Sequence, residues 1–261
     1  MLNRDIRRTA LFILINSMLP VLMVASACAF LSSLWGYACI SVINGKDVLL
    51  NAVCIALTVM RNTLSIYFYI RSWVLGKGRV SFVCEPLKNK LLRKSLIPVI
   101  ISTLIIYIVL AIPVAIFFAG FVVWVISLVT KYTLNATVLG ILAAIYMVFM
   151  LFVLAAVSLA WHVWSVRPEY KAAGILGRGF KYTWNNWAGW LWFTITTRFW
   201  PILMWNVLGH FISSNIMIIL FIPVWAWMFI ANAGYIYENI LRFEFAREDA
   251  YNYTENLISG N

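Results

Sequence analysis

The sequence predicts an all-α, polytopic membrane protein with six transmembrane helices and both termini in the cytoplasm. Three observations lead to this fold class. The chain of 261 residues is 64% hydrophobic and only 11% charged, far from the composition of a water-soluble domain. Its apolar runs match the length needed to cross a bilayer, about 20 residues. Its basic residues gather in alternate loops, as they do on the cytoplasmic side of membrane proteins.

Six apolar runs separated by charged clusters are the predicted spans. They lie near 10–43, 48–70, 96–129, 136–164, 187–208 and 216–237. At about 1.5 Å per residue, the longest runs exceed a hydrocarbon core of about 30 Å and must tilt, bend or emerge. Pro20 in the first run and Pro98, Pro113 and Gly120 in the third favour a bend, because proline removes a backbone donor and clashes with the preceding turn. No segment is long enough for a separate soluble domain, so residues 1–261 form one transmembrane domain.

The first run also has the basic and then apolar order of a secretory signal. Its apolar part continues to Ile43, whereas the apolar region of a signal peptide spans about 7 to 15 residues. An uncleaved first span is therefore the favoured interpretation.

The distribution of Lys and Arg gives the predicted orientation. With six spans and an internal N-terminus, the outer side carries only Lys46 and Lys131. The inner side carries Arg4, Arg7, Arg8, Arg71, Lys77, Arg79, Lys88, Lys90, Arg93, Lys94, Arg167, Lys171, Arg178, Lys181, Arg242 and Arg247. Splitting the third run at Pro113 would place the group around Arg167 outside, so the asymmetry favours six spans. The net charge of +11 then indicates anionic lipid head groups as neighbours rather than nucleic acid, since no recognition module accompanies it.

Two of the cytoplasmic loops are predicted to contain short interfacial helices. The first helix covers Pro86 to Lys94, where leucines alternate with Lys88, Lys90, Arg93 and Lys94 in the pattern of a helix on an anionic surface. The second covers Pro168 to Leu176, with Gly177 and Gly179 expected to end it. Its basic neighbours are Lys171, Arg178 and Lys181. Either loop is a membrane-hugging connector or a docking surface for a protein partner or a second copy of the chain.

A resemblance to a known family follows from three segments: "GKGRVSF" at 76–82, "LIPVIISTLI" at 96–105 and "GRGFKYTWNNWAGW" at 177–190. Their order resembles the six-span bacterial membrane domains of the YciC type, which also occur fused to glycerophosphodiester phosphodiesterases. The resemblance implies their fold and a bacterial inner-membrane location. It does not imply phosphodiesterase activity, because this chain contains no such domain.

A second resemblance concerns the permease subunits of ABC importers. Ala172, Ala173 and Gly177 match the spacing of the loop with which those subunits dock an ATPase. Lys171 stands where that family has an acidic residue, and the downstream Ile-x-Leu-Pro is missing.

The sequence contains no arrangement that predicts catalysis or a metal site. Every acidic residue lies in a loop, in a tail or at the end of a span, whereas acid–base chemistry inside a membrane needs buried or paired carboxylates. The four cysteines lie 11, 15 and 30 residues apart, which is not a metal-binding spacing. No enzyme activity, cofactor or metal is expected.

Two arginines lie deep in predicted spans and are the candidate ligand-binding residues. Burying such a charge costs about 2.5 to 3.5 kcal/mol on insertion scales, and no intramembrane acid is available to compensate it. Backbone carbonyls, a water cavity, an aromatic face, or an anionic lipid or solute are the possible partners. If both arginines face the bundle interior, the second and fifth spans should border one cavity. Its polar residues would be Thr58, Arg61 and Ser65 with Thr194 and Arg198.

Two functional hypotheses remain. The first is a non-catalytic inner-membrane protein that acts as a structural or interaction subunit of an envelope complex. The second is a transport subunit with an anion or lipid-phosphate path near Arg61 and Arg198.

Overall fold

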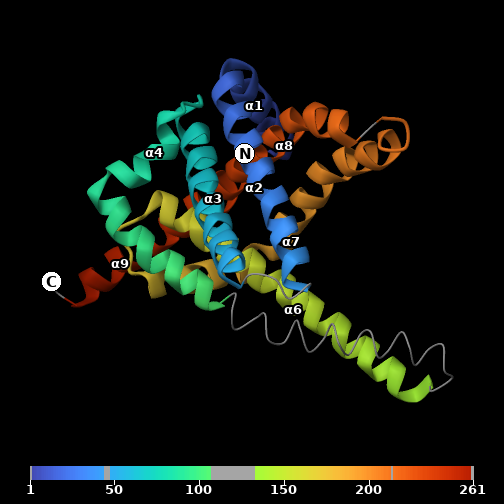
Figure 1. Cartoon of the computed structure of the whole chain (residues 1–261). Coiled ribbons are helices and arrows are strands. Elements are labelled where there is room, and N and C mark those ends of the chain that lie inside the picture. Colours follow the sequence, from blue (N-terminus) through green and yellow to red (C-terminus); the bar gives the residue numbers. More distant parts are fainter. Residues whose placement is uncertain (1, 44–47, 107–132, 213, 260–261) are drawn as a thin grey trace.

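The computed structural model of the protein describes residues 2–43, 48–106, 133–212 and 214–259 (Figure 1). Within these ranges the regular elements are helices and no strand occurs, which confirms the predicted all-α class. The elements are α1 (Asn3–Asn16), α2 (Met18–Ile43), α3 (Val48–Leu75), α4 (Ser81–Lys88), a helix at 90–106, α6 (Thr133–Val166), α7 (Ala172–Leu208), α8 (Ser214–Ile236), the π-helical turn η1 (Tyr237–Leu241) and α9 (Arg242–Ser259).

Two of the described helical segments are long and apolar enough to cross a membrane. They are Ala144–Val166 in α6 and Ile219–Ala250, which runs from α8 through η1 into α9. The bent pair Asn3–Asn16 and Met18–Phe30 adds a third if it counts as one span. These segments support the predicted membrane setting. The part of the third predicted run beyond residue 106 lies outside the described residues.

The first predicted run, 10–43, is bent. α1 and the beginning of α2 meet at Ser17 and differ in direction by 100°. The bend lies one turn before Pro20, which has no N–H to donate to the carbonyl of Asn16 and whose ring clashes with it. The Ser17 hydroxyl oxygen accepts a 2.7 Å hydrogen bond from the N–H of Gly78, which ties the corner to the loop after α3. The structure confirms the bend that Pro20 predicts and adds the contact that holds it.

The interfacial helix predicted over Pro86 to Lys94 has the wrong bounds. α4 ends at Lys88, and a second helix runs over 90–106 into the third predicted span. Asn89 separates the two with an extended backbone, φ −75° and ψ 120°. Its Oδ1 accepts a 2.9 Å hydrogen bond from the N–H of Leu91. Because a capping side chain satisfies amides that the first turn leaves free, it starts a new helix here.

The second predicted loop helix, Pro168 to Leu176, is also wrong in both bounds. Pro168 lies in the turn before α7, and α7 then continues for 37 residues through Gly177 and Gly179. A Cβ atom at position 179 would lie 2.5 Å from the carbonyl oxygen of Ala156 in α6, whereas nothing lies within 4 Å of one at position 177. Gly179 therefore marks the close crossing of α6 and α7, where a small residue lets two backbones approach.

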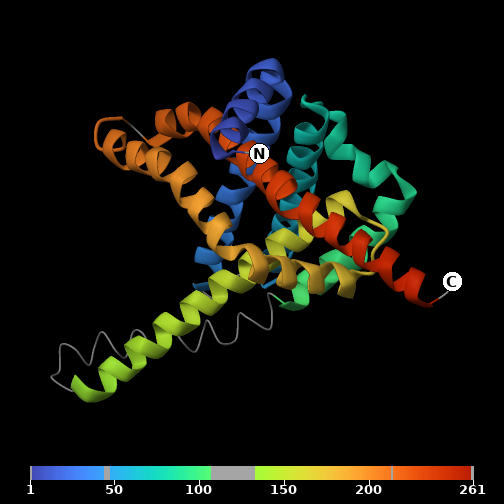
Figure 2. The same ribbon diagram turned by 180° about the vertical axis from the view of Figure 1, so that it is seen from behind.

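The last predicted span, 216–237, continues beyond its predicted end. Figure 2 shows α8 and α9 as one long rod that finishes at the C-terminus, with η1 between them. The rod is central, because α8 packs against α1, α2, α3 and α7. Trp73 of α3 is buried against Gly234, and its indole N–H donates to Glu238 Oε1 at 3.2 Å.

Candidate functional site

Arg61 lies in α3 and faces α2. Its Nη1 donates to the carbonyl oxygen of Cys28 in α2 at 3.4 Å, and its Nε donates to Asn62 Oδ1 at 3.0 Å. The hydroxyl of Ser65 donates to the carbonyl oxygen of Asn62 at 3.0 Å. A backbone carbonyl and a neighbouring amide therefore take part in solvating this charge. The side chain of Thr58 lies outside the described residues.

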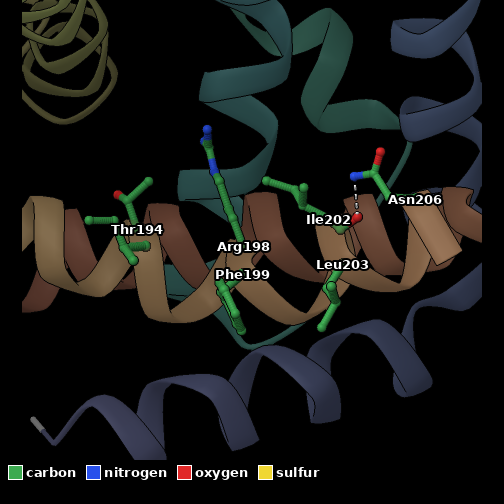
Figure 3. Close-up of a pocket in the computed structure, with 7 residues that line it drawn as sticks. Thr194, Arg198, Phe199, Ile202, Leu203 and Asn206 are labelled. Carbon is green, nitrogen blue, oxygen red and sulfur yellow. Dashed lines mark hydrogen bonds between the residues drawn. The ribbon is translucent and has the colours of Figure 1, made fainter.

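Arg198 lies in an open cleft of about 360 Å³ whose lining comes from α7 (Figure 3). The cleft is lined by Thr194, Ile195, Arg198, Phe199, Ile202, Leu203 and Asn206. Arg198 extends from the side of α7 that also carries Asn206, and Asn206 donates to the carbonyl oxygen of Ile202 at 2.8 Å. The Arg198 side chain is exposed, and its guanidinium forms no hydrogen bond or ion pair within the described residues.

The structure does not bring the two arginines together. α3 packs mainly against α2, α4, α6 and α8, whereas α7 packs mainly against α6 and α8. Helices α6 and α8 each contact both α3 and α7. No residue of α3 lines the cleft around Arg198. Among the described residues, the cleft around Arg198 therefore includes Thr194 but not Ser65, and a cavity shared by the two polar stripes stays a prediction.

The basic residues of the first loop form an exposed surface, called here the basic surface, which consists of Lys88, Lys90, Arg93 and Lys94. None of the four takes part in an ion pair within the described residues. Two leucines between them are also exposed, Leu87 at 44% and Leu91 at 51%. This combination of solvated cations and apolar side chains matches the chemistry of an anionic membrane surface.

The basic residues of the second loop differ in their surroundings. Lys171 is exposed immediately before α7, and its role in docking stays a prediction. Arg178 and Lys181 instead point toward Glu248 of α9, with Nε and Nζ at 2.9 and 3.6 Å from its carboxylate oxygens. The Arg178 guanidinium also lies 3.8 Å from the centre of the Tyr170 ring. The donors of Arg178 are therefore engaged inside the protein.

Glu248 belongs to a polar cluster that the sequence interpretation missed. The Tyr182 hydroxyl donates to Glu248 Oε1 at 2.7 Å. One turn earlier in α9, Glu244 Oε1 accepts hydrogen bonds from Asn185 and Asn186 of α7 at 3.2 and 3.1 Å. Glu244 is only 6% exposed, so the segment after the last predicted span is a helix that buries this carboxylate against α7. We call Arg178, Tyr182, Glu244 and Glu248 the α7–α9 clasp.

Electrostatics in the clasp keep its donors protonated. Burial raises the pKa of the Tyr182 hydroxyl, and its hydrogen bond to Glu248 raises it further. Burial opposes the charge of Arg178, but the hydrogen bond and the negative charge of Glu248 outweigh that effect and raise its pKa. Both groups therefore remain hydrogen-bond donors to Glu248 at neutral pH.

Arg7 is a second residue whose place was not predicted. The loop charges predict only that Arg7 lies on the cytoplasmic side, whereas the structure shows its Nη2 donating to the Thr196 hydroxyl of α7 at 2.6 Å. Its guanidinium lies 5.5 Å from the centre of the Phe193 ring, and its carbonyl oxygen accepts a 3.1 Å hydrogen bond from the Trp227 indole. Arg7 therefore connects the N-terminal helix to α7 and α8. Its positive charge alone indicates only which side of the membrane this end of the chain lies on.

Among the residues that the structure describes, no group of three or more His, Cys, Asp and Glu side chains is placed to hold a metal ion. No family model, curated protein or solved structure matches the chain. The resemblances to YciC-type membrane domains and to importer permeases therefore stay predictions from the sequence.

Proposed function

We propose that this chain is a non-catalytic, six-span protein of a bacterial inner membrane that acts as a structural or interaction subunit of an envelope complex. In this proposal both termini lie in the cytoplasm, and the basic surface holds anionic lipid head groups of the facing leaflet. The partner protein is another envelope component or a second copy of the chain. YciC-type membrane domains are the proposed relatives.

The observation that carries the proposal is the composition of the basic surface. Four cations stand in solvent without partners among the described residues, next to Leu87 and Leu91. Basic residues just outside a membrane span each contribute about 1 kcal/mol of attraction to an anionic leaflet. Arg61 and Arg178, by contrast, bind groups of the protein itself. The basic surface is therefore a better candidate than these two arginines for binding anionic lipid.

Neutralising Lys88, Lys90, Arg93 and Lys94 to Gln is expected to remove most of the stabilisation that phosphatidylglycerol gives the purified protein. Each charge lost removes up to about 1 kcal/mol of attraction, so the loss of four should weaken binding by between about tenfold and about a thousandfold. The measurement is the melting temperature in detergent with increasing phosphatidylglycerol, with phosphatidylcholine as the neutral control.

A pair of double variants separates this surface from net charge alone. Arg242 and Arg247 are exposed on α9, and changing both to Gln should leave most of the lipid response intact, whereas changing Lys88 and Lys90 to Gln removes the same net charge and should weaken it. An unchanged lipid response in the fourfold variant would contradict lipid binding by the basic surface and leave protein docking as its role.

The alternative function is a transport subunit with an anion or lipid-phosphate path. The observation in its favour is the cleft around Arg198, where an exposed guanidinium stands beside Thr194 and Asn206 without a partner among the described residues. A guanidinium binds oxyanions through paired donors, which suits phosphate. Co-purification of a stoichiometric ATPase with the intact protein would favour this function, whereas another envelope protein or a self-oligomer would favour the first.

A further inference from the structure

We propose that the cleft between the end of α3 and α4 binds the phosphate of an anionic glycerophospholipid, and that Glu85 occupies the Arg71 side of this site when no lipid is present. The inference rests on the proposed function and gives it a specific site. The cleft has a volume of about 510 Å³. It is lined by Arg71, Ser81, Phe82, Glu85, Lys88 and Asn89.

The cleft supplies the groups that a phosphate diester needs. Arg71 and Lys88 provide positive charge from two different helices, and Ser81 adds a hydroxyl at the beginning of α4. The buried Phe82 ring packs against Phe68, at 6.5 Å between ring centres, and gives the cleft an apolar floor. Arginine presents a planar fork of donors that matches phosphate oxygens, and lysine adds a mobile point charge.

The ion pair that now occupies the Arg71 donors is weak. Arg71 Nη2 and Nε lie 3.3 and 3.4 Å from the Glu85 carboxylate, whereas strong pairs of this kind are about 2.7 to 2.9 Å apart. The two side chains are 41% and 30% exposed, so solvent screens their attraction. Glu85 also interacts with the Tyr67 hydroxyl, which gives its carboxylate a second partner when Arg71 turns to a ligand.

The surroundings of the cleft favour a lipid over a soluble anion. Val80 precedes Ser81 and is 46% exposed, and Leu87 precedes Lys88 and is 44% exposed. Exposed apolar side chains beside a cationic cleft fit a head group with acyl chains below it. A free phosphate would leave them without a role.

The start of the neighbouring helix adds a further reason for an anion at this place. Lys90 and Arg93 lie in the first turn of the helix at 90–106, although the positive end of a helix dipole disfavours cations there. A phosphate bound next to Lys88 and Asn89 would offset this repulsion. Lys88 belongs both to the cleft and to the basic surface. The other three residues of the basic surface would then contact the lipid head groups around the occupied cleft.

The test is a set of single substitutions titrated with short-chain phosphatidylglycerol in detergent by calorimetry. Glu85→Gln removes the competing carboxylate and should tighten binding by about threefold or more, while Arg71→Gln removes the fork and should weaken it by about tenfold. Arg71→Lys keeps the charge and should fall between wild type and Arg71→Gln. A gain of affinity in Glu85→Gln cannot come from misfolding.

Glu169→Gln is the matched control, because Glu169 pairs with Arg167 at 3.7 Å in another loop and its removal changes the net charge equally. It should bind as the wild type does. Wild-type affinity in both Glu85→Gln and Arg71→Gln would overturn the inference. If the fourfold basic-surface variant still lost lipid binding, the proposed function would stand without this site. Equal affinity for glycerol phosphate and for the short-chain lipid would overturn the assignment to lipid.

Discussion

Gly179→Ala is expected to lower the melting temperature of the purified protein, while Gly177→Ala, two residues away in the same helix, is expected to raise it. A methyl group at position 179 would lie 2.5 Å from Ala156 O and 2.8 Å from Ala160 Cβ, so α6 and α7 must move apart. Overpacking of this kind costs about 1 to 3 kcal/mol. A methyl group at position 177 meets nothing within 4 Å, and alanine favours a helix over glycine by about 1 kcal/mol.

The opposite signs make this pair informative. Both changes replace glycine with alanine in α7, so they share every effect on helix propensity and on the unfolded chain. The melting temperature in detergent, followed by the loss of helical circular dichroism, reports the difference. Equal stabilisation by the two substitutions would contradict the close crossing of α6 and α7 at Gly179. Destabilisation by both would contradict an unbroken α7.

Glu248→Gln is expected to destabilise the protein and release α9 from α7. The change leaves Arg178 without its 2.9 Å partner and weakens the hydrogen bond that the Tyr182 hydroxyl donates. Breaking a fully buried pair costs about 3 to 5 kcal/mol, and we expect roughly half of that, because the Glu248 and Arg178 side chains keep 15% and 29% exposure.

Asp249→Asn is the matched control for this prediction. Asp249 is the next residue of α9 and pairs with Arg167 at 3.2 Å, but its side chain is 60% exposed. Such a surface pair contributes at most about 1 kcal/mol. Hydrogen exchange of the α9 amides should increase strongly in Glu248→Gln and little in Asp249→Asn. Similar protection of α9 in both variants would mean that the clasp does not hold this helix.

The all-α class and the membrane setting were predictable because they follow from the hydrophobic composition of the whole chain rather than from any single contact. Pro20 also predicted a bend correctly, since the loss of a donor and the ring clash are local effects that no tertiary contact removes. Gly177 and Gly179 show a feature that the local sequence could not predict. Both have the same helix propensity, yet one meets open space and the other meets α6, and only the packing of another helix decides between them.

The sequence predicted what kind of interaction a side chain needs more often than it predicted which group provides that interaction. Arg61 was expected to need solvation, and a backbone carbonyl of α2 provides part of it. The clasp had a signal that could have found it, because Arg178 and Tyr182 on one helix and Glu244 and Glu248 on another each repeat at four residues. That spacing places each pair on one helix face, but it does not say that the two faces meet. Arg7 gave no such signal.

In the proposed topology the basic surface faces the cytoplasmic leaflet. This orientation can be checked by finding on which side of the membrane two other positions lie. Reporters whose activity depends on the compartment would be fused at Lys131 and at Ile175. With six spans, the reporter at Lys131 should read as periplasmic and the one at Ile175 as cytoplasmic. Two reporters that read on the same side would contradict this topology, because the loops with their basic residues would then no longer share the cytoplasmic face.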